Sequence, residues 1–276
     1  MRLKKNKIVL SYILGFVTLF LIVLLLLVLI IKFTICNKNY LYHLVKTNNY
    51  YQTIYDEINE EMENYLMSTG FTNEILNNLY TLDEVKNDIN LFIENTYDGK
   101  VTKLQKNSIK EKLDKNIEEF LKKSNLSILN KNDLTLFENE MVEIYYNEVT
   151  LYKMANDFIP KYHKLNKIVN LVLLILGVIT IILLVIMKKV KMYSFGVIFL
   201  GTGMIFLFIQ MAIYDRFDME NILIITENFS QLLRIILKYI SKLMSFTGII
   251  LCLFGMFKIF TFSLRRKSRK VLKIDD

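Results

Sequence analysis

The chain has 276 residues, 53% of them hydrophobic, with one proline and nine glycines. This composition is too apolar and too poor in turn-forming residues for an ordinary soluble domain of that length. The formal net charge is +8, and the two cysteines, Cys36 and Cys252, lie at the edge of one apolar segment and inside another, which excludes a disulfide framework. Membrane-spanning helices are therefore expected.

Four segments are apolar enough to cross a bilayer. The first, residues 8–31, carries no charge and forms about 36 Å of helix, against a hydrocarbon core of about 30 Å. Its apolar run is longer than the core of a cleavable secretory signal, so the sequence predicts an uncleaved signal anchor. The other predicted spans are residues 168–187, 192–214 and 243–264.

The positions of lysine and arginine predict the orientation, because short loops rich in these residues stay on the cytoplasmic side. With four crossings all the basic clusters fall on one side. We therefore predict a cell-membrane protein with cytoplasmic segments at residues 1–7, 188–191 and 265–276. The residues that set this topology are Arg2, Lys4, Lys5, Lys7, Lys188, Lys189, Lys191, Arg265, Arg266, Lys267, Arg269 and Lys270.

Residues 32–167 are predicted to form an extracytoplasmic helical domain. Between residues 37 and 166 there are 15 lysines, no arginine and 21 acidic residues, a net charge of −6. Apolar residues recur there at helical spacing, in stripes such as Ile54, Ile58 and Met62. The predicted fold class is an all-α membrane protein, with four transmembrane helices and an antiparallel helical bundle between spans one and two.

Local signals place some helix ends within this domain. Thr81 with Glu84 and Ser108 with Glu111 match the capping box, in which side chain and backbone satisfy each other's N–H groups at a helix start. A last helix is expected from about residue 133 to residue 158, with Pro160 marking its end before the second span. Gly70 and the segment from Tyr97 to Ser108 are the best candidates for loops.

Residues 215–242 form the outer connection between spans three and four and allow two interpretations. Arg234, Lys238 and Lys242 recur every four positions beside an apolar face. The segment is either an amphipathic helix at the outer interface or the beginning of a long, tilted fourth helix.

The sequence predicts no catalytic, cofactor-binding or metal site. His43 and His163 are expected at different heights above the membrane, without metal-ligand spacing. The acidic residues from Asp56 to Glu63 could attract calcium or a basic partner, but a solvated face is the favoured interpretation because no EF-hand loop is present. Lys258 is interpreted as a snorkelling lysine at a helix end. Gly196, Gly201 and Gly203 are predicted to permit close helix packing.

A resemblance covers most of the chain. The segments Asn49-Tyr50-Tyr51, Met62-Glu63-Asn64-Tyr65-Leu66, Gly70-Phe71 and Phe158-Ile159-Pro160-Lys161 resemble uncharacterised four-span membrane proteins of low-GC Gram-positive bacteria. The order of the spans is also similar, in topology only, to ABC-transporter permeases of the lipoprotein-export and cell-division type.

Two functions follow as hypotheses. The first is a non-enzymatic multi-pass membrane protein that presents its helical domain to an envelope or protein partner. The alternative is a permease-like subunit of an ABC transporter that works with a separate ATPase. The basic tails are expected to contact anionic lipid headgroups, and a nucleic-acid partner is not expected.

Overall fold

The computed structural model describes the backbone of residues 2–100, 106–125, 131–150, 152–187, 193–216 and 227–271, and side chains from residue 12 to residue 264 within those ranges, apart from 106–107, 152–160, 193–194, 215–216 and 227–229. All regular secondary structure in these residues is helical, which confirms the predicted all-α class.

The chain divides into two compact units. Unit 1 is Met1–Asn37, Asn166–Ile222 and Arg234–Asp276, and unit 2 is Lys38–Leu165 and Leu223–Leu233.

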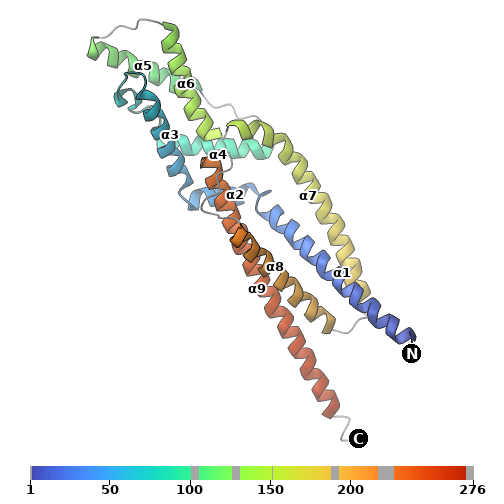
Figure 1. Cartoon of the computed structure of the whole chain (residues 1–276). Helices are drawn as coiled ribbons and strands as arrows, with labels where there is room; N and C mark the ends of the chain where they lie inside the picture. Colours follow the sequence, from blue (N-terminus) through green and yellow to red (C-terminus); the bar gives the residue numbers. More distant parts are fainter. Residues whose placement is uncertain are drawn as a thin grey trace. The chain divides into compact units, whose positions relative to one another are not determined.

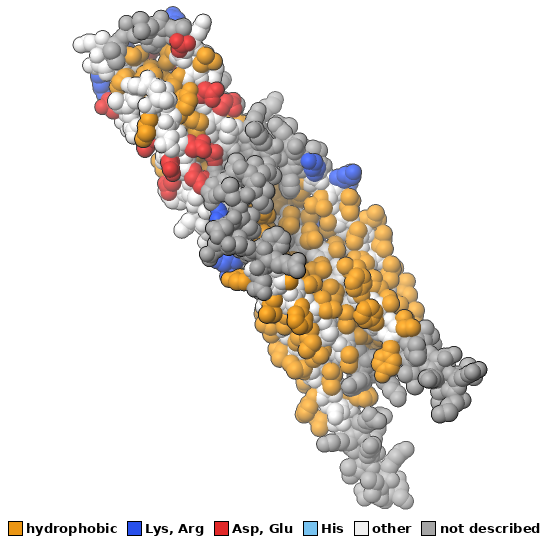
Figure 2. Space-filling view, in the orientation of Figure 1, with side chains coloured by type: hydrophobic (Ala, Val, Ile, Leu, Met, Phe, Trp, Pro, Cys, Tyr) orange, Lys and Arg blue, Asp and Glu red, His pale blue; other side chains and the backbone are white. Residues whose placement is uncertain are grey.

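Four helices are long and apolar enough to cross a membrane, as predicted (Figure 1). They are α1 (Arg2–Phe33), α7 (Tyr152–Met187), α8 (Tyr193–Arg216) and α9 (Glu227–Val271). Their apolar stretches are Tyr12–Phe33, Lys161–Met187, Phe195–Tyr214 and Ser230–Leu264. Hydrophobic side chains cover the visible surface of unit 1 (Figure 2). A surface of this kind is unfavourable in water and suits hydrocarbon.

Neighbouring helices of unit 1 alternate in direction. Thr18 and Lys32 of α1 contact Met187 and Asn166 of α7, with 3.1 Å from the Thr18 hydroxyl to the Met187 sulfur and 2.7 Å from the Lys32 ammonium to the Asn166 amide oxygen. Low residue numbers in α1 thus meet high numbers in α7, so the two helices are antiparallel. Met187 also shares an apolar cluster with Ile22 and Ile198, which places the beginning of α8 at the same end of the unit.

Helices α8 and α9 approach closely through glycines from both helices. A Cβ atom on Gly203 would lie 2.6 Å from the Gly248 carbonyl oxygen, and one on Gly196 would lie 3.1 Å from the Gly255 carbonyl oxygen. Because 196 faces 255 while 203 faces 248, these helices are antiparallel as well. The prediction of close packing at these two glycines fits this geometry, and Gly201 instead faces Leu19 of α1, whose Cδ1 would be 2.6 Å from an added Cβ.

Unit 2 contains α2 (Lys38–Thr47), α3 (Tyr50–Leu66), the 3-10 helix η1 (Asn73–Leu76), α4 (Leu82–Asp98), α5 (Lys106–Ser124) and α6 (Lys131–Thr150). Helix α3 packs against α2, α4 and α6, and α5 packs against α6 and η1. The core consists of the apolar residues of the predicted stripes and of residues around η1. Its buried members include Leu44, Ile54, Ile58, Met62, Leu66, Ile75, Leu79, Val85, Leu113, Ile117 and Met141.

The structure confirms one predicted helix start and corrects two boundaries. At Thr81 the capping box forms, with the Glu84 N–H donating to the Thr81 hydroxyl at 3.2 Å and the Thr81 N–H donating to the Glu84 carboxylate at 2.7 Å. The Ser108 capping box is wrong, because α5 begins earlier, at Lys106. The end predicted at Pro160 is also wrong. Helix α7 continues through it, since a proline removes a single N–H donor and a 36-residue helix absorbs that loss.

Helix α9 is continuous from Glu227 to Val271 and therefore covers residues 227–242 as well as the predicted fourth span. Lys258 does not mark its end, because the helix continues for three further turns. The Lys258 ammonium lies 5.3 Å from the centre of the Phe254 ring, an arrangement in which the ring face attracts the cation.

The contact between α8 and α9 predicts a difference between two glycine-to-alanine substitutions. Gly203→Ala would place its methyl group 2.7 Å from the Cys252 sulfur and 2.6 Å from the Gly248 carbonyl, so the helices must separate. We expect a loss of about 1–3 kcal/mol in stability. Thermal unfolding in lipid nanodiscs measures it. Gly177→Ala on α7 is the control, because nothing lies within 4 Å of its added methyl group. Equal melting temperatures for the two variants would contradict the close contact.

Candidate functional site

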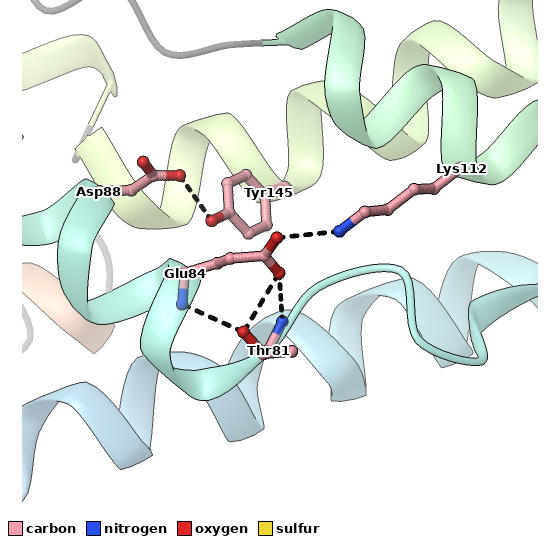
Figure 3. A network of polar contacts seen from close by, with 5 residues as sticks. All are labelled: Thr81, Glu84, Asp88, Lys112 and Tyr145. Atoms are coloured by element: carbon pink, nitrogen blue, oxygen red, sulfur yellow. Dashed lines mark hydrogen bonds and ion pairs between the residues drawn. The ribbon is translucent and has the colours of Figure 1, made fainter.

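A network of polar side chains joins α4, α5 and α6 in unit 2 (Figure 3). The capping residue Thr81 holds Glu84 at the first turn of α4, and the other oxygen of Glu84 accepts a hydrogen bond from the Lys112 ammonium of α5 at 2.9 Å. Lys112, followed by Thr81, holds the pKa of Glu84 below its ordinary value against the opposing effect of burial. Glu84 is therefore ionised, and both of its carboxylate oxygens accept hydrogen bonds from residues of its own chain.

One turn further along α4, Asp88 accepts a hydrogen bond from the Tyr145 hydroxyl of α6 at 2.7 Å. Burial raises the pKa of Asp88, and the Tyr145 hydrogen bond opposes that rise. Burial, followed by the Asp88 carboxylate, raises the pKa of Tyr145 far above its ordinary value. The phenol therefore stays protonated and acts as a donor. This pair closes the network across the α4–α6 contact.

Aromatic rings extend the same region towards α3. The Tyr80 ring lies 5.1 Å from the Tyr145 ring and 5.7 Å from the Tyr55 ring, and its hydroxyl donates to Asn59 at 2.7 Å. Burial raises the pKa of Tyr80 as well. A buried tyrosine combines a large apolar area with one polar atom that needs a partner, and Asn59 supplies it. These contacts make the interior rigid, and the side chains that form them already have partners within the chain.

Two more carboxylate groups of unit 2, besides Asp88, have raised pKa values. Burial, followed by the charges of Glu61 and Glu57 on α3, raises the pKa of Glu148 on α6 to about 7. At the α5–α6 contact, burial and then the neighbouring Asp114 raise the pKa of Glu138, while the Lys110 ammonium, 3.5 Å away, lowers it. Glu148 therefore exchanges its proton near neutral pH, and its negative charge appears only as the pH rises through that range.

The outer side of α3 is an acidic face, made by Asp56, Glu60, Glu61 and Glu63, all of them exposed. Helix α3 contains no lysine or arginine. Lysines on α2, α4 and α5 instead pair with carboxylates elsewhere, in contacts such as Lys38–Glu94, Lys86–Asp83 and Lys112–Glu84. Among the described residues no cation lies within ion-pair distance of Glu60, Glu61 or Glu63. Red side chains gather on the visible face of unit 2 (Figure 2).

The structure places the residues that the sequence singled out on different helices. The glycines of α8 lie at helix contacts in unit 1. His163 lies against Gly99, while His43 is on α2, a helix distinct from α1. In the described part of the chain no group of three or more histidine, cysteine or acidic side chains could hold a metal ion. The basic residues predicted to set the topology fall outside the described side chains, and Lys188, Lys189 and Lys191 fall outside the described backbone too.

Sequence reasoning missed the partners of several of these residues. Gly248 and Gly255 share the seven-residue spacing of Gly196 and Gly203, a signal that was present in the sequence. The pairing of Asp88 with Tyr145 had no such signal, because 57 residues separate them.

Comparison with known proteins identifies no relative, since no family model, curated protein or solved structure matches the chain. The chain's own features therefore define its class. In its described residues it is an all-helical protein, with four helices that suit a membrane and a second helical unit with an apolar core.

The Asp88–Tyr145 pair predicts a pH-dependent loss of stability in Tyr145→Phe. The substitution leaves a half-buried carboxylate without its donor, at a cost of about 1–3 kcal/mol at neutral pH. Because the pKa of Asp88 is already raised and rises further without this donor, the cost should shrink as the pH falls and the carboxyl is protonated. Chemical unfolding at pH 8 and pH 5 measures the difference from the parent chain. Tyr55→Phe is the control, because its hydroxyl has no hydrogen-bond partner among the described residues. A loss that is equal at both pH values would contradict the ionised pair.

Proposed function

We propose that this chain is a non-enzymatic multi-pass protein of the cell membrane that presents unit 2 outside the cytoplasm, where it binds an envelope or protein partner. The single observation that carries the binding proposal is the acidic face of α3. No lysine or arginine among the described residues forms an ion pair with its carboxylates. The exposed carboxylate of Glu84 and the half-buried carboxylate of Asp88 are bonded to Lys112 and Tyr145, which favours a structural role for them over a catalytic one.

The orientation is supported by charge and by helix direction. Helix α1 is antiparallel to α7, the end of α7 packs with the beginning of α8 through Met187 and Ile198, and α8 is antiparallel to α9. The first turns of α1 and the last turns of α9 therefore fall at the same end of unit 1. These turns carry the basic clusters from Arg2 to Lys7 and from Arg265 to Lys270. Retention of such clusters in the cytoplasm would leave residues 32–167 on the outer side. In the cytoplasm the tails would face anionic headgroups.

The partner class follows from charge complementarity. Four exposed carboxylates within about two turns of α3 repel one another, and a cationic partner would relieve that repulsion. Met67, just beyond the end of α3, is 81% exposed and offers apolar contact beside the charges. Such a surface suits a protein segment rich in lysine or arginine with some apolar residues.

Neutralising the acidic face tests this function in the full-length chain. A photo-crosslinking residue at the exposed position Asn64 should form a discrete adduct in the cells that produce the protein. The triple variant Glu60→Gln, Glu61→Gln, Glu63→Gln should lose most of that adduct. The matched control Glu74→Gln, Glu111→Gln, Glu119→Gln removes the same charge from exposed positions on other helices and should retain it. Equal adduct from both variants, or none from the parent, would refute the binding surface.

The permease-like alternative is favoured by one observation, the placement of a single large unit between α1 and α7 with short links around α8. It differs in its partner, which would be a separate ATPase on the cytoplasmic side. Purification in mild detergent should then recover ATP hydrolysis that depends on this chain. A complex without that activity would leave the first function as the one to pursue.

A further inference from the structure

Helix α4 contacts both ends of Lys38–Leu165, the longer of the two segments of unit 2. On the incoming side, α2 follows α1, and its Lys38 ammonium lies 3.4 Å from Glu94. The Tyr42 hydroxyl of α2 donates to the Asn90 carbonyl oxygen at 3.0 Å, and the Asn90 side chain accepts from Tyr51 of α3 at 2.7 Å. Burial, followed by the Glu94 charge, raises the pKa of Tyr42.

The other end of α4 contacts the outgoing segment, Lys161–Leu165 of α7. The Tyr97 ring lies 4.7 Å from the Tyr162 ring, and Tyr162 is 3% exposed. Gly99 ends α4 in the left-handed conformation, at φ +71°, and the imidazole of His163 lies over it. A Cβ atom on Gly99 would fall 2.6 Å from the His163 Cδ2 atom, so this contact requires a glycine.

We propose that α4 acts as a tie, that is, a helix that holds α2 and residues 161–165 of α7 at a fixed separation. Its contact with α7, here called the latch, lies at the Gly99 end of α4. The latch consists of the Tyr97–Tyr162 ring contact and the His163 ring on Gly99. It sets the separation between α2 and residues 161–165 of α7. Because residues 161–165 begin the second apolar stretch and α7 is one continuous helix, a movement of α4 would be passed to that stretch.

The tie goes beyond the proposed binding function and does not depend on it. Among the described side chains, α4 contacts α7 through Tyr97 and Gly99 at its end, whereas Asn90 and Glu94 contact α2 and α3 one turn or more earlier. We therefore expect the α7 contact to open first when α4 is displaced. A partner that displaced α4 would open the latch, and a chain without any partner would still show the latch closed.

The matched pair Gly99→Ala and Gly70→Ala tests the latch. Both glycines have positive φ, +71° and +81°, so both substitutions carry the same kind of backbone strain. Only Gly99 faces a ring, since nothing lies within 4 Å of a Cβ on Gly70. Spin labels at the exposed positions Lys46 and Lys164, in the full chain with Cys36 and Cys252 replaced by serine and held in nanodiscs, report the separation by pulsed electron resonance.

The parent chain and Gly70→Ala should show one narrow distance distribution. Gly99→Ala should broaden it and shift it to longer distances, because the methyl group displaces His163. The double variant Gly99→Ala, His163→Ala removes the clash and should restore much of the narrow distribution through the remaining Tyr97–Tyr162 contact. An unchanged distribution in Gly99→Ala, equal broadening in Gly70→Ala, or no recovery in the double variant would overturn the proposal. Circular dichroism of each variant separates latch opening from loss of the helices.

Discussion

Hydrocarbon cannot satisfy the hydrogen bonds of a polypeptide backbone, and this constraint organises unit 1. A chain that enters the bilayer must pair its N–H and C=O groups internally, so each apolar stretch forms a helix long enough to cross. Once the spans are helices, their association depends on shape, because lipid tails are as apolar as leucine side chains. The glycines of α8 and α9 supply that shape and bring the two backbones into contact.

Unit 2 is held by a different balance of forces. Its apolar core is conventional, but its interior also contains carboxylates and phenols, each of which is costly to bury alone. The structure provides partners for them, since the Tyr145 hydroxyl donates to Asp88 and the Tyr80 hydroxyl donates to Asn59. Such contacts have strict geometry, so they fix the relative positions of α4 and α6 more narrowly than apolar packing does. A rigid unit of this kind suits presentation of a surface.

The sequence predicted features that depend on neighbours within a few turns. Long apolar runs revealed four spanning helices, and the spacing of Thr81 and Glu84 revealed a capping box, because both are local properties of the chain. Contacts between distant residues were not predictable in this way. Tyr145 is one of several tyrosines on a helical stripe, and nothing local distinguishes it as the partner of Asp88. The continuation of α7 through Pro160 was not predicted, because proline usually ends a helix. Here the long helix tolerates the hydrogen bond that Pro160 cannot donate.

The proposed outer location of unit 2 and the proposed cytoplasmic location of the basic loops are tested most directly by cysteine accessibility in intact cells. Single cysteines at Asp83, which is highly exposed in unit 2, and at Lys189, between the second and third spans, are compared in a chain whose native cysteines are replaced by serine. A membrane-impermeant maleimide should label the cysteine at position 83 from outside and the cysteine at position 189 only after the membrane is opened. Labelling of both positions from the same side would contradict the proposed topology.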